Sequence, residues 1–219
     1  MGGLLTTPQV VPTFSSAATT AKKKTAFFAY LRPHIERVNA TVLEDREQLQ
    51  QLIAKQGDLN FLDQFFLRRL RLLYLGRDGD PEDLQALLKR IDLIPSALAL
   101  IQAAKESGWG SSRFARDGYN FFGQQCFIQG CGFTPKRRAQ GRRHEVAKFR
   151  STEDAVRAYV HNLNTHPSYQ GFRAQRAAMR SAGQPLKGGQ LAASLGSYSE
   201  RGDAYIAEIQ AMIRNNDLE

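Results

Sequence analysis

The sequence predicts a mainly α-helical fold with one small β-hairpin lobe. Apolar residues recur at helical spacing through most of the chain after residue 21, and capping residues and glycines divide them into separate helices. The helical pattern fails only between Gly108 and Arg150, where glycines are frequent and aromatic residues cluster. Functional residues concentrate on irregular segments that a rigid scaffold holds, so this segment is the expected place for a site.

Two parts of the chain precede that central region. Residues 1–21 are rich in Thr, Pro, Ser and Ala without periodicity, which predicts a flexible arm, mobile or draped, that stands outside the core. Residues 22–90 are predicted to form an N-terminal helical region. Its first helix is expected to reach about Lys55, and Pro33 is the place where it can bend.

Two shorter helices complete the N-terminal helical region. Asp58 is expected to cap the first of them. Asp80, followed by Pro81, predicts the start of the other, which ends near Arg90. The helix after Asp58 has a predicted apolar side that includes Leu59, Leu62, Phe66, Leu70 and Leu73.

Residues 91–219 are predicted to form the main globular domain. Its first helix, Ile94–Ser107, is apolar on nearly every side and therefore belongs at the centre of the fold. The stretch Gly132–Phe149 fits a two-stranded hairpin that turns near Gln140. Further helices are expected over about 151–165, 171–182, 190–195 and 202–215.

The composition favours an anionic partner. Thirty Lys and Arg residues stand against 21 Asp and Glu residues, so the net charge of +9 attracts polyanions. The basic residues are scattered over several predicted elements without a nucleic-acid-binding motif, so nucleic acid is not the expected partner. An anionic wall polymer or membrane surface explains the charge.

Cys126 and Cys131 are the only cysteines in the chain. Their spacing can close a small disulfide loop, or both can stay free thiols, but it does not build a four-ligand zinc site. No apolar run reaches the roughly 18 residues of a transmembrane segment. The N-terminus lacks the basic and apolar regions of a signal peptide, so a signal was removed or export is not encoded in this chain.

Glu106 holds the position that most suggests chemistry. It lies in the last turn of the predicted central helix, directly before Gly108-Trp109-Gly110. The negative end of the helix dipole and partial desolvation by Trp109 both disfavour the carboxylate, so its pKa is expected to rise toward the range of a general acid. From spacing alone, a surface Glu that closes a helix is the simpler alternative.

Two strings read together resemble a known family. The run Ala103–Gly110 followed by Tyr119–Gly123 resembles the catalytic helix and loop of the peptidoglycan glucosaminidases of glycoside hydrolase family seventy-three. The resemblance is strongest to the Bax-like branch and covers roughly Ile91–Ile213, while Lys22–Arg90 resembles the N-terminal part of Bax-like proteins. Supporting blocks are Ser112–Ala115, Gly130–Gly132, His144–Val146, Asn162–His166 and Tyr198–Gly202.

The resemblance implies a lysozyme-like helical domain in which Glu106 is the general acid. It also suggests that Asn120 bonds the acetamido sugar or orients Glu106. Trp109 and Tyr119 can each stack on a sugar face, although Trp109 also fits a structural plug at the helix end. Phe122 and Tyr159 are further candidates for the substrate-binding surface, with the buried core as the alternative for Phe121 and Phe122 and for Tyr159 on the inner face of its helix.

The second catalytic group is harder to assign. Relatives outside the Bax-like branch often carry a Glu on the first strand of the hairpin, whereas Gly132–Arg137 has none. Glu145 on the second strand is then the candidate to activate water, and a solvated residue paired with Arg142 or Arg143 is the alternative. Without a second carboxylate, the acetamido oxygen of the substrate can act as nucleophile, steadied by the hydroxyl of Tyr198.

The expected function is therefore hydrolysis of the β-1,4 bond after N-acetylglucosamine in peptidoglycan glycan strands. No metal and no cofactor are expected, because acid-assisted hydrolysis needs neither. The resemblance places the protein in the periplasm or cell envelope and leaves its oligomeric state open. The alternatives are a lytic transglycosylase or muramidase on the same fold and an inactive cell-wall-binding module.

Overall fold

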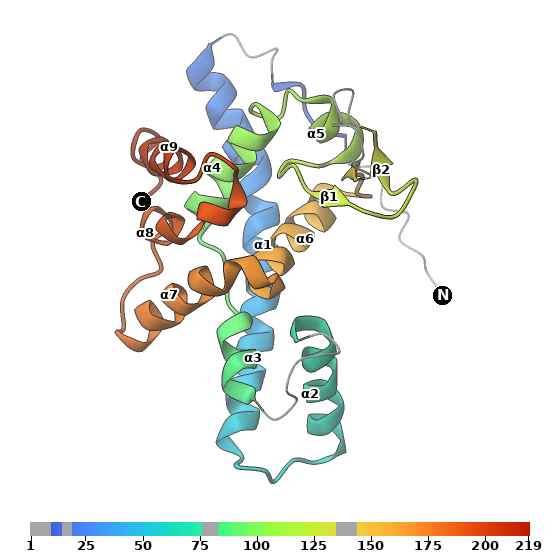
Figure 1. The fold of residues 1–219 in the computed structure, drawn as a ribbon, viewed down its shortest axis with the longest axis vertical. Helices are drawn as coiled ribbons and strands as arrows, with labels where there is room; N and C mark the ends of the chain where they lie inside the picture. The colour runs from blue at the N-terminus through green and yellow to red at the C-terminus, as the bar shows by residue number, and fades with distance from the viewer. Residues whose placement is uncertain (1–9, 15–18, 76–82, 135–143) are drawn as a thin grey trace. The chain divides into compact units, whose positions relative to one another are not determined.

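The protein is mainly helical with a small sheet, as the sequence predicts (Figure 1). The computed structural model describes residues 10–14, 19–75, 83–134 and 144–219. Their α-helices are α1 (Thr20–Ala54), α2 (Phe61–Tyr74), α3 (Leu84–Arg90), α4 (Ser96–Ser107), α5 (Arg113–Gly118), α6 (Thr152–Thr165), α7 (Gln170–Ser181), α8 (Gly188–Leu191) and α9 (Asp203–Arg214). The strands are β1 (Gln125–Cys126), β2 (Gly132–Phe133) and β3 (Glu145–Ala147).

The chain divides into two compact units, each built from two segments. Unit 1 consists of Met1–Ile35 and Leu100–Tyr159, and unit 2 of Glu36–Ala99 and Val160–Glu219. The boundary predicted after residue 90 falls inside unit 2. Among the described residues, no helix is both long enough and apolar enough to span a bilayer.

The long N-terminal helix is confirmed, and α1 continues through Pro33. In unit 1 it buries Phe27, Leu31 and Ile35 completely, at the three- and four-residue spacing of a helix face. The arm before it departs from the prediction. Phe14 is 4% exposed and meets Phe27 edge to face at 5.4 Å, so this part of the arm belongs to the core.

The N-cap of α2 was assigned to the wrong residue. Asn60, not Asp58, caps the helix, through a reciprocal capping box with Asp63. The predicted apolar side is also partly wrong, because Leu62 is 74% exposed and Leu73 is 43% exposed. Apolar residues lie all round this helix, so their spacing did not single out the buried face. The residues that α2 buries are Leu67, Leu70 and Tyr74.

The short helices α3 (Leu84–Arg90) and α5 (Arg113–Gly118) differ in how well the sequence predicts them. Asp83 caps α3 through the backbone N–H of Ala86, at 2.7 Å, while the predicted cap Asp80 lies outside the described residues. The short helix α5 was not predicted. It is capped by Ser112 through the N–H of Ala115, at 3.1 Å. Six residues carry too little periodicity for a sequence pattern to show.

The sheet has three strands, with β3 in the centre and order β1-β3-β2. The predicted pairing of the hairpin strands is confirmed, since β2 pairs antiparallel with β3, with Phe133 opposite Val146. The turn expected near Gln140 lies outside the described residues. β1 was missed because two residues are too short to alternate. It pairs with the other edge of β3, with Cys126 opposite Glu145.

A cluster of arginines surrounds the buried carboxylate of Asp92 in unit 2. Arg176 is fully buried and donates to the carbonyls of Lys89, Arg90, Asp92 and Leu93. The last carbonyls of a helix have no partner within the helix, and here Arg176 supplies donors at the end of α3. Folding removes these carbonyls from water, and without Arg176 they would be buried without a hydrogen bond. The bonds from Arg176 therefore offset the cost of burying its charge.

We expect acid to destabilise unit 2 through Asp92. Burial by itself raises the pKa of Asp92, but the hydrogen bond from Arg180 and the charges of Arg176, Arg46 and Arg180 outweigh it and hold this pKa below its ordinary value. A carboxyl with a depressed pKa stabilises the fold fully above its unfolded pKa of about 3.9, and the stabilisation is lost as the pH falls through the folded pKa.

Urea unfolding of the protein at stepped pH values below about 5 measures this loss. The variant Asp92→Asn should show a shallower acid dependence than the wild type. If the unfolding free energy of both proteins fell equally with decreasing pH, other carboxyl groups would control the loss of stability in acid.

Candidate active site

Glu106 stands at the exposed end of a buried helix. α4 is completely buried at Leu100, Ile101 and Ala104, whereas Glu106 in its last turn is exposed. A rigid, packed helix therefore presents a carboxylate to solvent. The partial desolvation expected from the sequence stays a prediction.

The shape of the turn after Glu106 explains why serine and glycine residues follow it. The Ser107 hydroxyl donates to the Ala103 carbonyl at 2.6 Å and accepts the Gly110 N–H at 2.8 Å. Gly108, Trp109 and Gly110 all have positive φ, at 57°, 59° and 72°. Glycine adopts this conformation readily. The chain thus leaves α4 abruptly and does not cover the carboxylate.

Trp109 packs against the first part of α1. Its ring lies 5.6 Å from the Phe27 ring and 5.4 Å from the Phe28 ring, and the ammonium of Lys24 lies 5.2 Å from its centre. A Cβ atom at Gly110 would come within 2.5 Å of the Phe14 ring, so only glycine fits beside it. These contacts favour the structural plug over the sugar platform for Trp109.

Asn120 fixes the loop that faces Glu106. Its side chain is 2% exposed and donates to the carbonyls of Gln124 and Ala147, at 2.8 and 2.9 Å, while its carbonyl oxygen accepts the Gln124 N–H at 3.0 Å. A direct contact with a sugar is contradicted by this burial and by these three bonds. Asn120 instead ties the loop to β3.

Gly123 is the loop residue that approaches Glu106. A Cβ atom at this position would lie 3.5 Å from Glu106 Oε2 and 3.9 Å from Glu106 Cβ. The φ of Gly123 is 66°, a conformation that side-chain-bearing residues rarely adopt. The glycine therefore lets the backbone pass beside the carboxylate.

Phe122 and Tyr159 belong to the core beneath this loop. Their rings stack at 4.0 Å with an angle of 11° between the planes, and they are 2% and 1% exposed. The Tyr159 hydroxyl donates to Gln102 Oε1 at 2.6 Å. The structure contradicts their assignment as substrate-binding residues. It supports the buried alternative instead, and Phe121 is likewise fully buried.

Gln102 was not identified from the sequence. It lies on α4 four residues before Glu106, fully buried, and receives the Tyr159 hydrogen bond from α6. The signal available was a single polar residue within the apolar stretch Ala97–Ala104 of this helix. A buried amide requires a partner, which here is a tyrosine 57 residues away.

Tyr119 remains accessible and has a tyrosine neighbour from α1. It is half-buried, with a φ of 55°, at the end of α5. Burial raises the pKa of Tyr30, its hydrogen bond with Thr152 at 2.6 Å opposes this rise, and the charge of Tyr119 adds to it. Of the aromatic candidates in unit 1, Tyr119 is the one whose role as a sugar platform stays a prediction.

Glu145 is held by the loop between the two cysteines. Cys126 and Cys131 form a disulfide, which resolves the two alternatives left by the sequence. Glu145 is 9% exposed, and its two carboxylate oxygens accept the backbone N–H groups of Gly130 and Gly132 at 3.0 and 2.8 Å. The solvated-residue alternative is therefore wrong, and Arg142 and Arg143 lie outside the described residues. The contacts favour a structural role over water activation.

We expect Glu145→Gln to weaken the disulfide loop more than the chemistry. An amide keeps one acceptor but turns its NH₂ group toward a backbone N–H, which should cost about 1–3 kcal/mol of unfolding free energy. The rate of glycan hydrolysis should fall less than about tenfold, since loss of a general base costs at least about a hundredfold. Chemical denaturation and turnover on purified peptidoglycan measure both effects.

A variant as inactive as Glu106→Gln, with unchanged stability, would restore Glu145 as a catalytic base. Glu153→Gln provides the control for a Glu-to-Gln change, because Glu153 forms a surface ion pair with Arg157 of the same helix, at 3.0 Å.

Cys126, Cys131 and Glu145 also lie close together. Within the described ranges they are the one group of three possible ligands that are near enough to share a metal ion. The two sulfur atoms and a Glu145 oxygen lie within 4.8 Å of one another. The disulfide engages both sulfur atoms, and the backbone N–H groups engage the carboxylate. The proximity of these three side chains is thus explained by the loop itself.

Tyr198 belongs to unit 2 and lies in a stack of tyrosines. Its ring is 5.7 Å from Tyr205, nearly parallel, and 6.1 Å from Tyr169. Tyr198 itself is half-buried. Its proposed contact with the acetamido group stays a prediction.

The comparisons with known proteins identify the family. The family described as "Mannosyl-glycoprotein endo-beta-N-acetylglucosaminidase" matches residues 81–218. "Protein bax" of Escherichia coli (strain K12) is 34% identical over 199 residues, which cover 89% of this chain and 70% of that protein. No solved structure gives a significant match. The chain therefore belongs to the glucosaminidase family of glycosidases and is a Bax-like member of it.

Proposed function

We propose that this protein hydrolyses the β-1,4 bond after N-acetylglucosamine in peptidoglycan glycan strands, with Glu106 as the general acid. The observation that carries the proposal is the exposed Glu106 carboxyl at the end of a buried helix, with Gly123 beside its Oε2 atom. Family membership supports a glycosidic substrate. The helix that carries Glu106 is packed through its buried residues, which suits a carboxyl group that must be positioned against one glycosidic bond.

In the proposed reaction, Glu106 gives its proton to the glycosidic oxygen while the bond from that oxygen to the anomeric carbon breaks. The sugar becomes oxocarbenium-like as the leaving strand departs as an alcohol. The acetamido oxygen of the same sugar attacks the anomeric carbon and forms a cyclic intermediate. Water then opens it, and the Glu106 carboxylate takes the proton from that water.

Substrate assistance is preferred to a second carboxylate because of Glu145. Both of its oxygens already accept backbone N–H groups, so it is poorly placed to take a proton from water. The acetamido group supplies the nucleophile from the substrate itself, a known exception to hydrolysis by two carboxylates.

The disulfide and the charge support a location in the cell envelope. Structural disulfides persist in oxidising compartments such as the periplasm, and Cys126 and Cys131 are bonded. The net charge of +9 favours contact with an anionic wall. We propose the periplasm or cell envelope as the site of action.

A lytic transglycosylase is the second candidate, and the engagement of Glu145 favours it too. Such an enzyme needs one catalytic acid, because the sugar's own hydroxyl replaces water. Mass spectrometry of the strand ends released from purified peptidoglycan separates the possibilities. Reducing N-acetylglucosamine ends support the proposal, whereas reducing or anhydro-muramic ends would replace it with a muramidase or a transglycosylase. No released ends from folded protein would leave a wall-binding module.

A further inference from the structure

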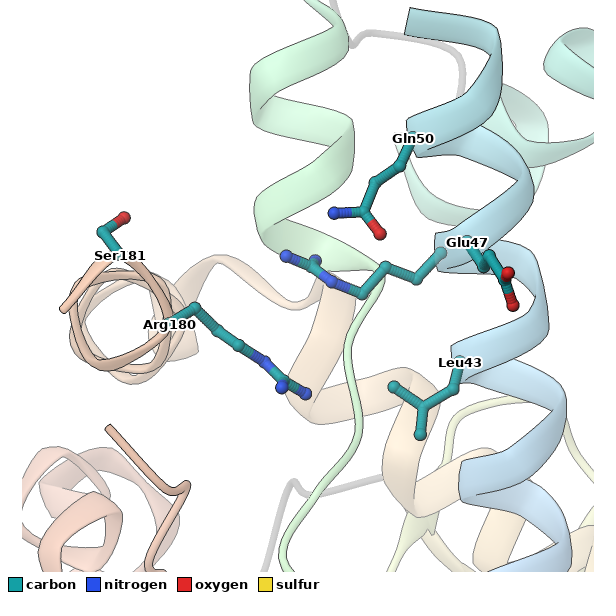
Figure 2. A pocket seen from close by; sticks show the side chains of 6 residues that line it. Leu43, Glu47, Gln50, Arg180 and Ser181 are labelled. Atoms are coloured by element: carbon teal, nitrogen blue, oxygen red, sulfur yellow. The ribbon is translucent and has the colours of Figure 1, made fainter. Parts of the chain in front are cut away.

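A second group of polar and charged side chains lies in unit 2, around an open pocket of about 650 Å³ between α1 and α7 (Figure 2). Its lining consists of Leu43, Arg46, Glu47, Gln50, Arg180 and Ser181. In Figure 2, the Arg180 side chain extends toward α1 and the Gln50 amide is directed toward the α7 side. Donors from two helices thus face the same space.

Positive charge in this region exceeds negative charge. The carboxylate of Asp92 is shared by Arg180 at 2.8 Å, Arg46 at 3.7 Å and Arg176 at 4.0 Å. Three guanidinium groups therefore face one buried carboxylate. The lining acid Glu47 is exposed, and Figure 2 shows its carboxylate directed away from Arg180.

Two of these guanidinium groups keep donors for a ligand. Arg46 uses Nη1 for the carbonyls of Leu88 and Ile91, at 2.5 and 2.9 Å, and no described residue accepts from its Nε or Nη2. Arg180 uses Nε and Nη2 for Asp92, at 3.1 and 2.8 Å, and within the described ranges its Nη1 has no acceptor. Both groups are fixed by their existing bonds, so little side-chain freedom is lost on binding.

The pocket continues inward toward Asp92 and the arginines around it. An adjoining cavity of about 110 Å³ shares Arg46, Arg180 and Ser181 with the outer pocket and also reaches Lys89 and Asp92. The paired N–H donors of an arginine match the spacing of two oxygen atoms in a planar carboxylate or a tetrahedral phosphate group. We propose that this pocket binds one oxyanion, the phosphate or carboxylate group of a ligand, between Arg46 and Arg180. The site lies in unit 2 and does not rest on the hydrolytic function.

The test uses a substitution that adds a competing carboxylate without breaking the arginine cluster. Gln50→Glu places a negative charge four residues from Arg46, on the same face of α1. Gln51→Glu is the matched control, because Gln51 follows Gln50 directly but lines a different pocket, with Lys55 and Leu62. Both glutamines are exposed, so both variants should keep the fold and the melting temperature.

The full-length, ¹⁵N-labelled protein is titrated at low ionic strength with sodium phosphate and, separately, with sodium acetate. The Nε–H resonances of Arg46 and Arg180 report binding. We expect saturable shifts for at least one anion, with a dissociation constant on the order of 1 mM. Gln50→Glu should weaken binding by at least about tenfold and Gln51→Glu by less than about twofold.

The two anions also identify the preferred ligand. Tighter binding of phosphate assigns a phosphate-bearing ligand, tighter binding of acetate assigns a carboxylate, and equal binding supports the shared chemistry. Absence of saturable shifts in both titrations would overturn the proposal. So would equal weakening by the two variants, which would show attraction to the overall charge of the protein and not to this pocket.

Discussion

Glu106→Gln should lower the rate of peptidoglycan hydrolysis by about two to four orders of magnitude, the usual contribution of general acid catalysis. The amide has nearly the same shape but has no acidic proton to give to the leaving oxygen. Because Glu106 is exposed, the melting temperature should change little. Release of reducing ends from purified peptidoglycan measures the rate, and circular dichroism during heating measures stability.

The control for this prediction is the same substitution at Glu153. That residue lies in unit 1 and pairs with Arg157, and such a surface pair contributes at most about 1 kcal/mol to stability. Glu153→Gln should therefore keep wild-type activity. If Glu106→Gln also retains most of its activity, Glu106 has no part in the chemistry and the acid must be sought elsewhere.

Asn120→Ala should have the largest effect on stability among substitutions at the candidate site. It removes three hydrogen bonds and leaves the buried carbonyl of Ala147 and the N–H of Gln124 without their partner. Each such loss costs about 1–3 kcal/mol, so we expect a decrease of about 3 kcal/mol or more. For a chain of this size the melting temperature should fall by roughly 10 °C.

The kinetics of the same variant test the role of Asn120. A loop-positioning residue should lower kcat when it is lost, because Gly123 no longer holds its place beside Glu106. A sugar-binding residue would instead raise KM and leave the melting temperature unchanged, which would contradict our interpretation. Gln125→Ala is the matched control, since this amide is exposed and five residues further along.

Local patterns were sufficient to predict the longer helices. The apolar spacing in α1 and the apolar composition of α4 are properties of short stretches, and both helices lie within a few residues of their expected bounds. Where both faces of a helix are apolar, as in α2, spacing does not tell which one is buried. The exposure of Leu62 shows that packing against other elements made that choice.

The candidate site was predictable only in part. Glu106 and the loop around Asn120 were identified from a resemblance between strings, but the work that Asn120 does depends on Ala147, 27 residues away. The same holds for Glu145, whose two oxygens are engaged by a loop 13–15 residues earlier. Hydrogen-bond partners that meet only after folding leave no periodic signal in the sequence.

Phe14 and α1 also decide where this protein can be shortened. The family match begins at residue 81, yet the rings that cover Trp109 and Gly110 come from Phe14 and Phe27. A fragment cut at the family boundary would leave the turn after Glu106 with an uncovered apolar face. Shortened versions of this protein should therefore keep Phe14 and the start of α1 together with the matched segment.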